Sequence, residues 1–416
     1  MKIIGELDAE DFLTIQNMIN LKNLDLEEVN LTELPTKAFY KMKTIENLIL
    51  PHTLTIINDS EFYQNSLKSI IISSNVETIG EYAFYECPLK SINIPASVKA
   101  INKAAFMNCS SLATITFSKG SMLTKICGGK GFLSHGEKYY YGAFANCTAL
   151  TSIEIPANVE IIEEAAFKNC TALTTVTFEN NSSLKTICGA TYDYSYYGGA
   201  FSDCISLISI EIPASVETIE AAAFKGCLAL AKITFEKGIN LKKISGGYSE
   251  NRNTDGYFYG HGAFAKCTAL TSIEIPASVE VIEPEAFWGC SALITVSFEH
   301  ESQLKIIQGS YEKIYVGHSP NGYNRYYRSG GFRGLANLTT FDASNCSQIE
   351  SIEPSAFYHC SKLQSVKVGT MIPPTCGIDA FSELNSYTIL TVPKESIEAY
   401  KQANEWKNFT NITALN

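Results

Sequence analysis

The sequence predicts an α/β solenoid, in which short strands and short helical turns repeat along one stack of coils. The first observation is a phenylalanine that recurs with eight gaps of 22–25 residues and four longer gaps of 34–45 residues. The second is a strand-like alternation of apolar and polar residues that follows each of these phenylalanines. The third is that the two ends of the chain depart from the repeat and carry patterns that suit end caps.

Each repeat is anchored by one phenylalanine. In the unit that begins at Ala143, residues Leu150, Ile153 and Ile155 alternate as a short strand should. A second extended segment ends at Ile162, and a tight helical turn at the next Ala-Phe pair closes the unit. About 13 such units must stack, because each exposes an apolar face that only a neighbour can cover. The anchors are Phe39, Phe62, Phe84, Phe106, Phe144, Phe167, Phe201, Phe224, Phe264, Phe287, Phe332, Phe357 and Phe381.

The sequence at both ends of the chain predicts helices that cap the solenoid. Residues 1–30 are expected to form an N-terminal cap helix and a first strand, with Asp8 capping the helix. The apolar stripe of that helix would hold Phe12, Ile15, Met18 and Ile19.

The repeats are expected to fill residues 31–391. Residues 392–416 are expected to form a C-terminal cap helix that opens at Pro393. Its apolar positions would be Ile397, Tyr400, Ala403 and Trp406.

The composition excludes several classes of partner. The net charge is −11, which disfavours nucleic acid and anionic lipid because their binding proteins concentrate Lys and Arg. No run of about eighteen apolar residues could span a membrane. The residues after Met1 lack the apolar core of an export signal.

The thirteen cysteines predict buried thiols rather than a disulfide framework or a zinc site. Nine follow an anchor in the pattern Phe-x-x-Cys, and no pair has the CxxC spacing of a zinc site. The nine are Cys87, Cys109, Cys147, Cys170, Cys204, Cys227, Cys267, Cys290 and Cys360.

The repeat resembles a known family. The recurring Ile-Pro-Ala-Ser-Val-Glu-x-Ile-Glu-x-x-Ala-Phe-x-x-Cys-x-x-Leu, as in 212–230 and 275–293, looks like the BspA-like (Treponema-type) leucine-rich repeat. The resemblance implies a secreted or lipid-anchored bacterial surface protein that adheres to host proteins or to other cells. It therefore implies an extracellular or outer-cell-surface location. Since members carry an export signal, we expect this chain to be trimmed from a precursor that could also carry a lipid anchor.

Insertions account for the four long gaps. They fall in every second unit from Phe106 onward, between the second extended segment and the next anchor. Measured from Ile126, Ile187, Ile244 and Ile306 to the next anchor, they exceed a plain unit by 13, 9, 15 and 21 residues. Because they share one place in the repeat, we expect them on one face of the solenoid. They lie near 128–142, 189–199, 246–262 and 308–330.

Tyrosine dominates the insertions, which hold fifteen of the chain's 22 tyrosines among many Gly, Ser and Asn residues. Rigid aromatic rings on adaptable loops are the composition of antibody binding loops. We therefore expect a recognition face for a host or bacterial surface protein, with glycan binding as the alternative. A third interpretation is that the rings only pack on the solenoid. The fifteen are Tyr139, Tyr140, Tyr141, Tyr192, Tyr194, Tyr196, Tyr197, Tyr248, Tyr257, Tyr259, Tyr311, Tyr315, Tyr323, Tyr326 and Tyr327.

No catalytic signature is present in the sequence. Motifs such as HExxH, GxSxG, the P-loop and the Rossmann glycine pattern do not occur. His135, His261 and His318 lie in different insertions, too far apart on strand-spacing arithmetic to share a metal. The sequence therefore predicts a non-enzymatic protein without metal or cofactor.

Overall fold

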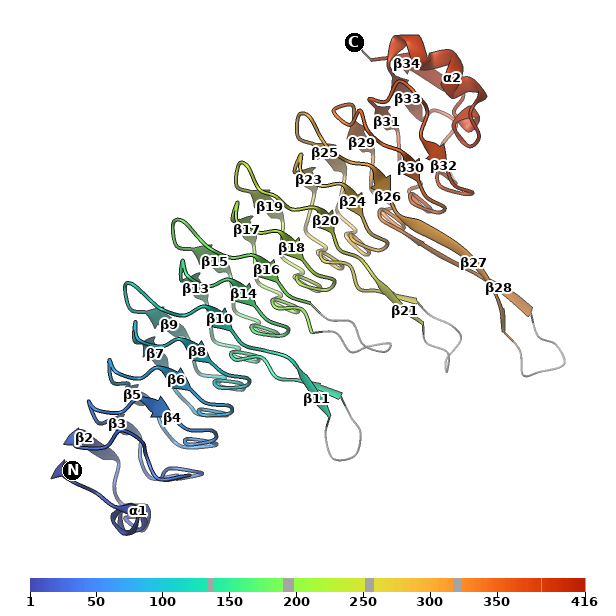
Figure 1. Cartoon of the computed structure of the whole chain (residues 1–416). Helices are drawn as coiled ribbons and strands as arrows, with labels where there is room; N and C mark the ends of the chain where they lie inside the picture. The colour runs from blue at the N-terminus through green and yellow to red at the C-terminus, as the bar shows by residue number, and fades with distance from the viewer. Residues whose placement is uncertain (133–137, 190–197, 251–257, 317–322, 383, 416) are drawn as a thin grey trace. The chain divides into compact units, whose positions relative to one another are not determined.

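The structure is a computed structural model that describes residues 1–132, 138–189, 198–250, 258–316, 323–382 and 384–415. Contacts divide the chain into two compact units. Unit 1 comprises residues 1–189 and 198–215, and unit 2 comprises the described residues from 216 onward. Each unit is a stack of coils built almost entirely from strands and turns (Figure 1).

Unit 1 has two columns of parallel strands. The longer strands form one column after a first sheet in the order β1-β2-β3-β5, and the two-residue strands form the other. The longer strands are β1 (Lys2–Gly5), β2 (Asn23–Val29), β3 (Asn47–Ile49), β5 (Ser69–Ile71), β7 (Ser91–Ile94), β9 (Thr114–Phe117), β13 (Ser152–Ile155), β15 (Thr175–Phe178) and β17 (Ser209–Ile212). The short ones are β4 (Ile56–Ile57), β6 (Thr78–Ile79), β8 (Ala100–Ile101), β10 (Lys125–Ile126), β14 (Ile161–Ile162) and β16 (Thr186–Ile187).

Unit 2 repeats this plan. Its longer strands are β19 (Lys232–Phe235), β23 (Ser272–Ile275), β25 (Thr295–Phe298), β29 (Thr340–Ala343), β31 (Ser365–Val368), β33 (Ile389–Val392) and β34 (Asn411–Ala414). Its short strands are β18 (Thr218–Ile219), β20 (Lys243–Ile244), β24 (Val281–Ile282), β26 (Ile306–Ile307), β30 (Ser351–Ile352) and β32 (Thr375–Cys376). The predicted alternation is confirmed, since Ile273 and Ile275 of β23 are buried while Ser272 and Glu274 are exposed.

The anchor phenylalanines form the core of each unit. All thirteen are at most 5% exposed, and their rings stack on those of the neighbouring coils. In unit 1 the Phe144, Phe167 and Phe201 centroids are 5.4 and 5.2 Å apart with nearly parallel rings. In unit 2 Phe287 and Phe332 lie 5.6 Å apart in the same way. Each coil is therefore covered only by its neighbours, as a solenoid requires.

The predicted helical turns at the anchors are not helices in the described residues. The turn around Phe167 makes i to i+3 hydrogen bonds, from Lys168 N to Ala165 O (2.9 Å) and from Cys170 N to Phe167 O (3.2 Å). It is bounded by two left-handed residues, Ala165 (φ 60°) and Asn169 (φ 59°). A helix cannot continue through such residues, so each turn stays one turn long.

The N-terminal cap matches the prediction in part. Asp8 caps α1 (Ala9–Gln16), accepting hydrogen bonds from the backbone of Glu10 and Asp11. Phe12 and Ile15 are buried, and the Phe12 ring meets Phe39 edge-on at 5.8 Å. Ile19 is 79% exposed because the helix ends before it, so the predicted four-residue stripe was wrong there.

The C-terminal cap is more broken than the single helix that the sequence predicts. After Pro393 come η1 (Lys394–Ser396), α2 (Ile397–Gln402) and η2 (Trp406–Asn408), and then β34, which pairs with β33. Tyr400 and Trp406 are fully buried, and Trp406 Nε1 donates to Pro374 O (2.8 Å). The predicted burial of these two rings is confirmed.

The nine Phe-x-x-Cys cysteines are all free and buried, as predicted. In eight of them the thiol donates a hydrogen bond to the carbonyl oxygen of the anchor phenylalanine one coil earlier, as Cys170 Sγ does to Phe144 O (3.2 Å). Burial raises the pKa of the Cys170 thiol to about 12, so this thiol is neutral.

One carboxyl group interrupts the core of unit 1. Glu61 precedes anchor Phe62, where nearly every other unit has alanine, and it is fully buried. Its Oε1 accepts a hydrogen bond from Phe39 N (3.1 Å). Burial raises the pKa of Glu61 from 4.5 to about 7, and the backbone donors only partly oppose this shift.

Glu61 predicts a specific pH dependence. A carboxyl whose pKa is raised on folding stabilises the fold below its unfolded pKa, and this contribution is lost as pH rises through the folded pKa. We expect unit 1 to lose about 3 kcal/mol of unfolding free energy between pH 4.5 and 8, because the pKa of Glu61 rises from 4.5 to about 7 on folding. Urea denaturation of wild type and Glu61→Gln at both pH values would check this. Identical pH slopes for the two proteins would contradict it.

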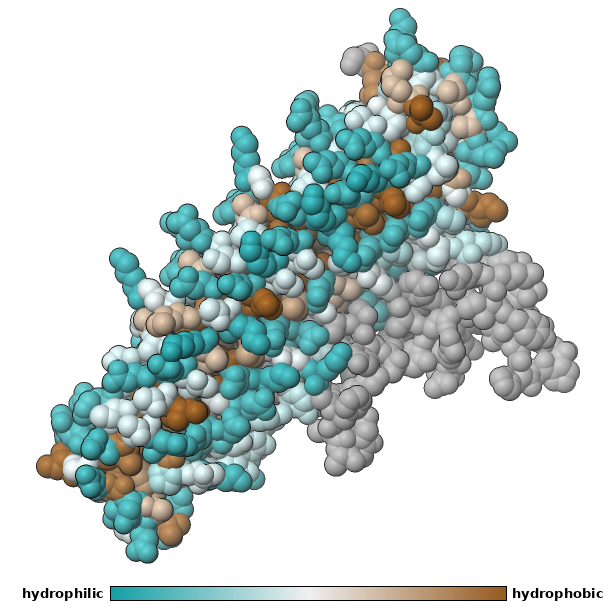
Figure 2. Space-filling view, viewed as in Figure 1, coloured by the Kyte–Doolittle hydropathy of each residue, from teal (hydrophilic) through white to brown (hydrophobic). Residues whose placement is uncertain are grey.

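Two further features concern the surface of the molecule and the length of its helices. Figure 2 shows one face of the molecule that is mostly hydrophilic, with small separate apolar spots among the coloured residues. No helix in the described part of the chain is long and apolar enough to cross a membrane.

Candidate functional site

The described insertions are β-hairpins rather than loops. β11 (Lys130–Phe132) pairs antiparallel with β12 (Lys138–Tyr140) in unit 1, and β21 (Tyr248–Glu250) pairs with β22 (Phe258–Gly260) in unit 2. The largest is formed by β27 (Gly309–Val316) and β28 (Tyr323–Gly330), which project from the stack of unit 2 (Figure 1). Most of the second insertion, 190–197, lies outside the described residues.

The strand register changes the length of the fourth insertion. Ile307, not Ile306, pairs with Ile282 in the column of short strands. The fourth insertion therefore exceeds a plain unit by 20 residues rather than 21.

The fifteen predicted tyrosines fall into three groups. Tyr192, Tyr194, Tyr196, Tyr197 and Tyr257 lie outside the described residues. For seven others the structure describes the backbone only, and it places them in hairpin strands: Tyr139, Tyr248, Tyr259, Tyr315, Tyr323, Tyr326 and Tyr327. The side chains of Tyr140, Tyr141 and Tyr311 are described, and all three stand at hairpin bases.

Tyr140 packs on the solenoid. It is 8% exposed, its ring lies directly against Gly198, and Lys168 Nζ is 5.9 Å from the ring centroid. Lys168 also pairs with Asp203 at 3.3 Å. Tyr140 therefore packs on the solenoid, as the third interpretation expects, rather than lying on the recognition face.

Tyr141 joins tyrosines that lie outside the insertions. Its ring meets Tyr82 edge-on at 5.7 Å, and the two rings, with Tyr85, cover Ala104, Met107 and Ala145. Tyr85 stacks on Tyr63 at 4.7 Å, and Tyr63 stacks on Tyr40 at 5.4 Å. Sequence reasoning missed this ladder, although Tyr40, Tyr63 and Tyr85 each directly follow an anchor phenylalanine.

The faces of the ladder rings are largely used by one another. The Tyr63 and Tyr85 rings are nearly parallel, with an angle of 7° between their planes. The Nζ atoms of Lys37 and Lys41 each lie 5.2 Å from the centroid of the Tyr40 ring. A sugar binds tyrosine through a ring face, so this ladder offers it little.

Arg328 holds the base of the β27–β28 hairpin. It stands directly opposite Tyr311 in the register, and its guanidinium lies 4.9 Å from the Tyr311 ring centroid and 4.3 Å from that of Tyr358. Its Nη2 also pairs with Asp379 at 2.8 Å. Tyr311 therefore has a structural partner at the base of the hairpin.

The third hairpin brings a buried histidine next to a buried lysine. His261 is fully buried and Lys225 is 2% exposed, with His261 Nδ1 2.7 Å from Lys225 Nζ. Burial, as the largest cause, and the charges of Lys225 and Lys266 together lower the pKa of His261 to about 3. The imidazole is thus neutral, and its Nδ1 accepts from the lysine ammonium.

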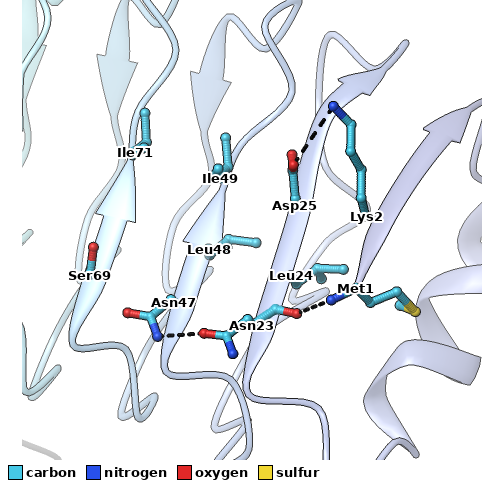
Figure 3. Close-up of a pocket in the computed structure, with 10 residues that line it drawn as sticks. All are labelled: Met1, Lys2, Asn23, Leu24, Asp25, Asn47, Leu48, Ile49, Ser69 and Ile71. Carbon is cyan, nitrogen blue, oxygen red and sulfur yellow. Dashed lines mark hydrogen bonds and ion pairs between the residues drawn. The ribbon is translucent and has the colours of Figure 1, made fainter.

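Two hollows lie on the strand faces, one in each unit. The hollow in unit 1 has a volume of 420 Å³ over β1, β2, β3 and β5 (Figure 3). Its polar side chains bind each other, since Asn47 Nδ2 donates to Asn23 Oδ1 (2.7 Å) and Lys2 lies 3.9 Å from Asp25. The hollow in unit 2, of 690 Å³, is lined by hydroxyl and amide groups together with Lys367, Ile389, Ala414 and Leu415, and Thr391 bonds Thr413 there at 3.2 Å. Several polar side chains in both hollows therefore already have partners within the protein.

Metal chemistry has no candidate site in the described residues, where no cluster of three or more His, Cys, Asp or Glu side chains could hold an ion. Of the three insertion histidines, only His261 lies among those residues.

The chain is similar to solved leucine-rich-repeat structures, of which the first supports the fold. A leucine-rich repeat protein from Bacteroides ovatus is 20% identical over 100% of this chain and 88% of its own, with a TM-score of 0.58. A leucine rich cell surface protein from Faecalibacterium prausnitzii is 22% identical over 89% and 88%, with a TM-score of 0.43. The pneumococcal vaccine antigen PcpA is 18% identical over 100% and 92%, with a TM-score of 0.44. No curated protein sequence matches the chain.

The family comparison covers most of the sequence. The model of the BspA type leucine rich repeat region matches in six copies over residues 14–129, 137–197, 195–248, 258–313 and 325–416. These segments contain the repeat pattern that carried the resemblance. The chain therefore belongs to the family of BspA type leucine-rich repeat proteins.

Proposed function

We propose that this protein is a non-enzymatic binding protein of the outer cell surface, which recognises a protein partner through its tyrosine-rich hairpins. The observation that carries the proposal is the position of the tyrosines along the β27–β28 hairpin. Tyr315, Tyr323, Tyr326 and Tyr327 all lie farther from the base than the Tyr311–Arg328 pair. They stand on a fixed two-stranded ladder, and a rigid support lowers the entropy lost on binding.

Three further observations support the proposal. The chain belongs to the BspA type leucine-rich repeat family, and its resemblance to that family implies adhesion at the cell surface. In the strand-face hollows Asn47 bonds Asn23 and Thr391 bonds Thr413, so these polar groups already have partners within the protein. Tyrosine is, with tryptophan and arginine, one of the side chains enriched at protein-binding hot spots. The ladder of Tyr40, Tyr63 and Tyr85 is a poor site for a glycan, because its rings use their faces on one another.

The test compares wild type with a tip variant that carries Tyr315→Ser, Tyr323→Ser, Tyr326→Ser and Tyr327→Ser. Both would be applied to an array of extracellular-matrix and cell-surface proteins and, in parallel, to a glycan array. We expect saturable binding to a protein, weakened at least about tenfold in the tip variant, since hot-spot truncations cost about 1–2 kcal/mol or more each. Its thermal midpoint should stay close to that of wild type, because the residues of the hairpin base are retained.

Two results would contradict the proposal. Glycan hits that the tip variant loses would establish the alternative ligand. Protein binding that survives the four substitutions would show that the partner uses another surface.

A further inference from the structure

The alternation of plain and inserted coils has a geometric counterpart, because each described hairpin rests on the plain coil that follows it. The coil of Phe144 rests on that of Phe167, the coil of Phe264 on that of Phe287, and the coil of Phe332 on that of Phe357. Three contacts recur at the same repeat positions in all three cases.

The first contact fixes the entry of the hairpin. Gly128, Gly246 and Gly309 each stand two residues after the last isoleucine of the short strand. Their N–H groups donate to Glu163 (2.9 Å), Glu283 (2.9 Å) and Glu353 (3.0 Å) of the following coil. A Cβ on any of these glycines would overlap a carbonyl oxygen of that coil, so no other residue fits.

The second contact fixes the exit. Gly142, Gly262 and Gly330 each stand two residues before an anchor, and a Cβ there would overlap the carbonyl oxygen of Ala165, Glu285 or Ser355 in the next coil. Each of those carbonyls belongs to a left-handed residue, with φ between 60° and 65°. The plain turn thus pushes its carbonyl toward the hairpin.

The third contact holds the returning strand. The residue four before the anchor of the inserted coil meets the residue directly after the anchor of the plain coil. The pairs are Tyr140 with Lys168, Gly260 with Trp288, and Arg328 with Tyr358. The side chains differ, whereas the positions do not.

We propose that every plain coil after a described hairpin is a platform that positions the hairpin, so that binding specificity belongs to the residues beyond the three contacts. This inference rests on the proposed function only in treating the hairpins as binding elements. It separates the candidate tyrosines: Tyr140 makes a platform contact and Tyr311 packs on Arg328, which makes another, whereas Tyr315, Tyr323, Tyr326 and Tyr327 lie beyond these contacts. Residues such as Glu353, Arg328 and Tyr358 are positioning residues, which act on a partner only through the hairpin.

Hydrogen exchange of the full chain tests the platform without any partner. In Arg328→Ala and in Glu353→Ala, amides of β27 and β28 should exchange at least about tenfold faster, while β30 and β31 keep their protection. Lys362→Ala is the matched control, because Lys362 Nζ also bonds the neighbouring coil, at Asn337 (2.8 Å), but lies outside the three contacts. It should leave the hairpin amides unchanged.

Two outcomes would overturn the platform. Hairpin exchange at the wild-type rate in both variants would show that the hairpin holds itself. Equal acceleration over β30 and β31 would show that the residues only stabilise the fold. Neither outcome bears on whether the outer tyrosines bind, which the tip variant decides separately.

Discussion

Phe167→Ala should reduce the unfolding free energy by about 3–5 kcal/mol, the usual cost of truncating a fully buried phenylalanine. The ring is 0% exposed and stacks between Phe144 at 5.4 Å and Phe201 at 5.2 Å. Its loss leaves a cavity that both neighbouring coils share. Because a coil is covered only by its neighbours, no distant contact can compensate.

Urea denaturation followed by circular dichroism measures this effect. The matched control is Thr177→Ala, an exposed strand position of the same coil, which should change stability by no more than about 0.5 kcal/mol. A loss below about 1 kcal/mol for Phe167→Ala would mean that the aromatic column does not carry the stability of unit 1.

Arg333→Ala should destabilise unit 2 by about 3–5 kcal/mol, the range found when one partner of a buried ion pair is removed. Glu285 is 1% exposed, and Arg333 meets its carboxylate through Nε at 2.7 Å and Nη2 at 3.3 Å. Burial raises the pKa of Glu285, and the arginine is the main group that opposes this rise. Without Arg333, a charged carboxylate would remain in the core.

A second substitution identifies the cause. Glu285→Gln in the Arg333→Ala background removes the stranded charge, while the amide oxygen can still accept from Gly330 N. We expect the double variant to recover most of the loss, and the single variant to regain stability as pH falls and the carboxyl group of Glu285 takes up a proton. A double variant no more stable than Arg333→Ala would point to lost packing of the arginine instead.

The sequence predicts the core far better than it predicts the surface. The spacing of phenylalanine and cysteine identifies the buried column correctly, because each repeat must present the same side chain at the same place for coils to stack. The helical turns were wrong because Ala165 and other ordinary residues take left-handed conformations. Only contacts with the next coil impose this, and a single repeat does not reveal it.

The hairpins show the same limit. Tyrosine and glycine composition pointed to adaptable loops, yet the β-branched and aromatic run at 314–316, the turn residues after it and the strand-like run from Tyr323 were a hairpin signal. The paired glycines at entry and exit were also visible in the sequence. Their meaning depended on which carbonyl of the following coil approaches them, which only the stacked structure shows. The ladder of Tyr40, Tyr63 and Tyr85 was missed because tyrosine directly follows the anchor in only four of the thirteen units, so it is not part of the repeat pattern.

The central claim is that the outer tyrosines of the hairpins bind a protein partner while the platform residues only hold them in place. The ratio of the dissociation constants of the tip variant and wild type for the partner found on the protein array tests it most directly. We predict a ratio of at least about ten, with the thermal midpoint of the tip variant equal to that of wild type. A ratio near one, at the same midpoint, would contradict it.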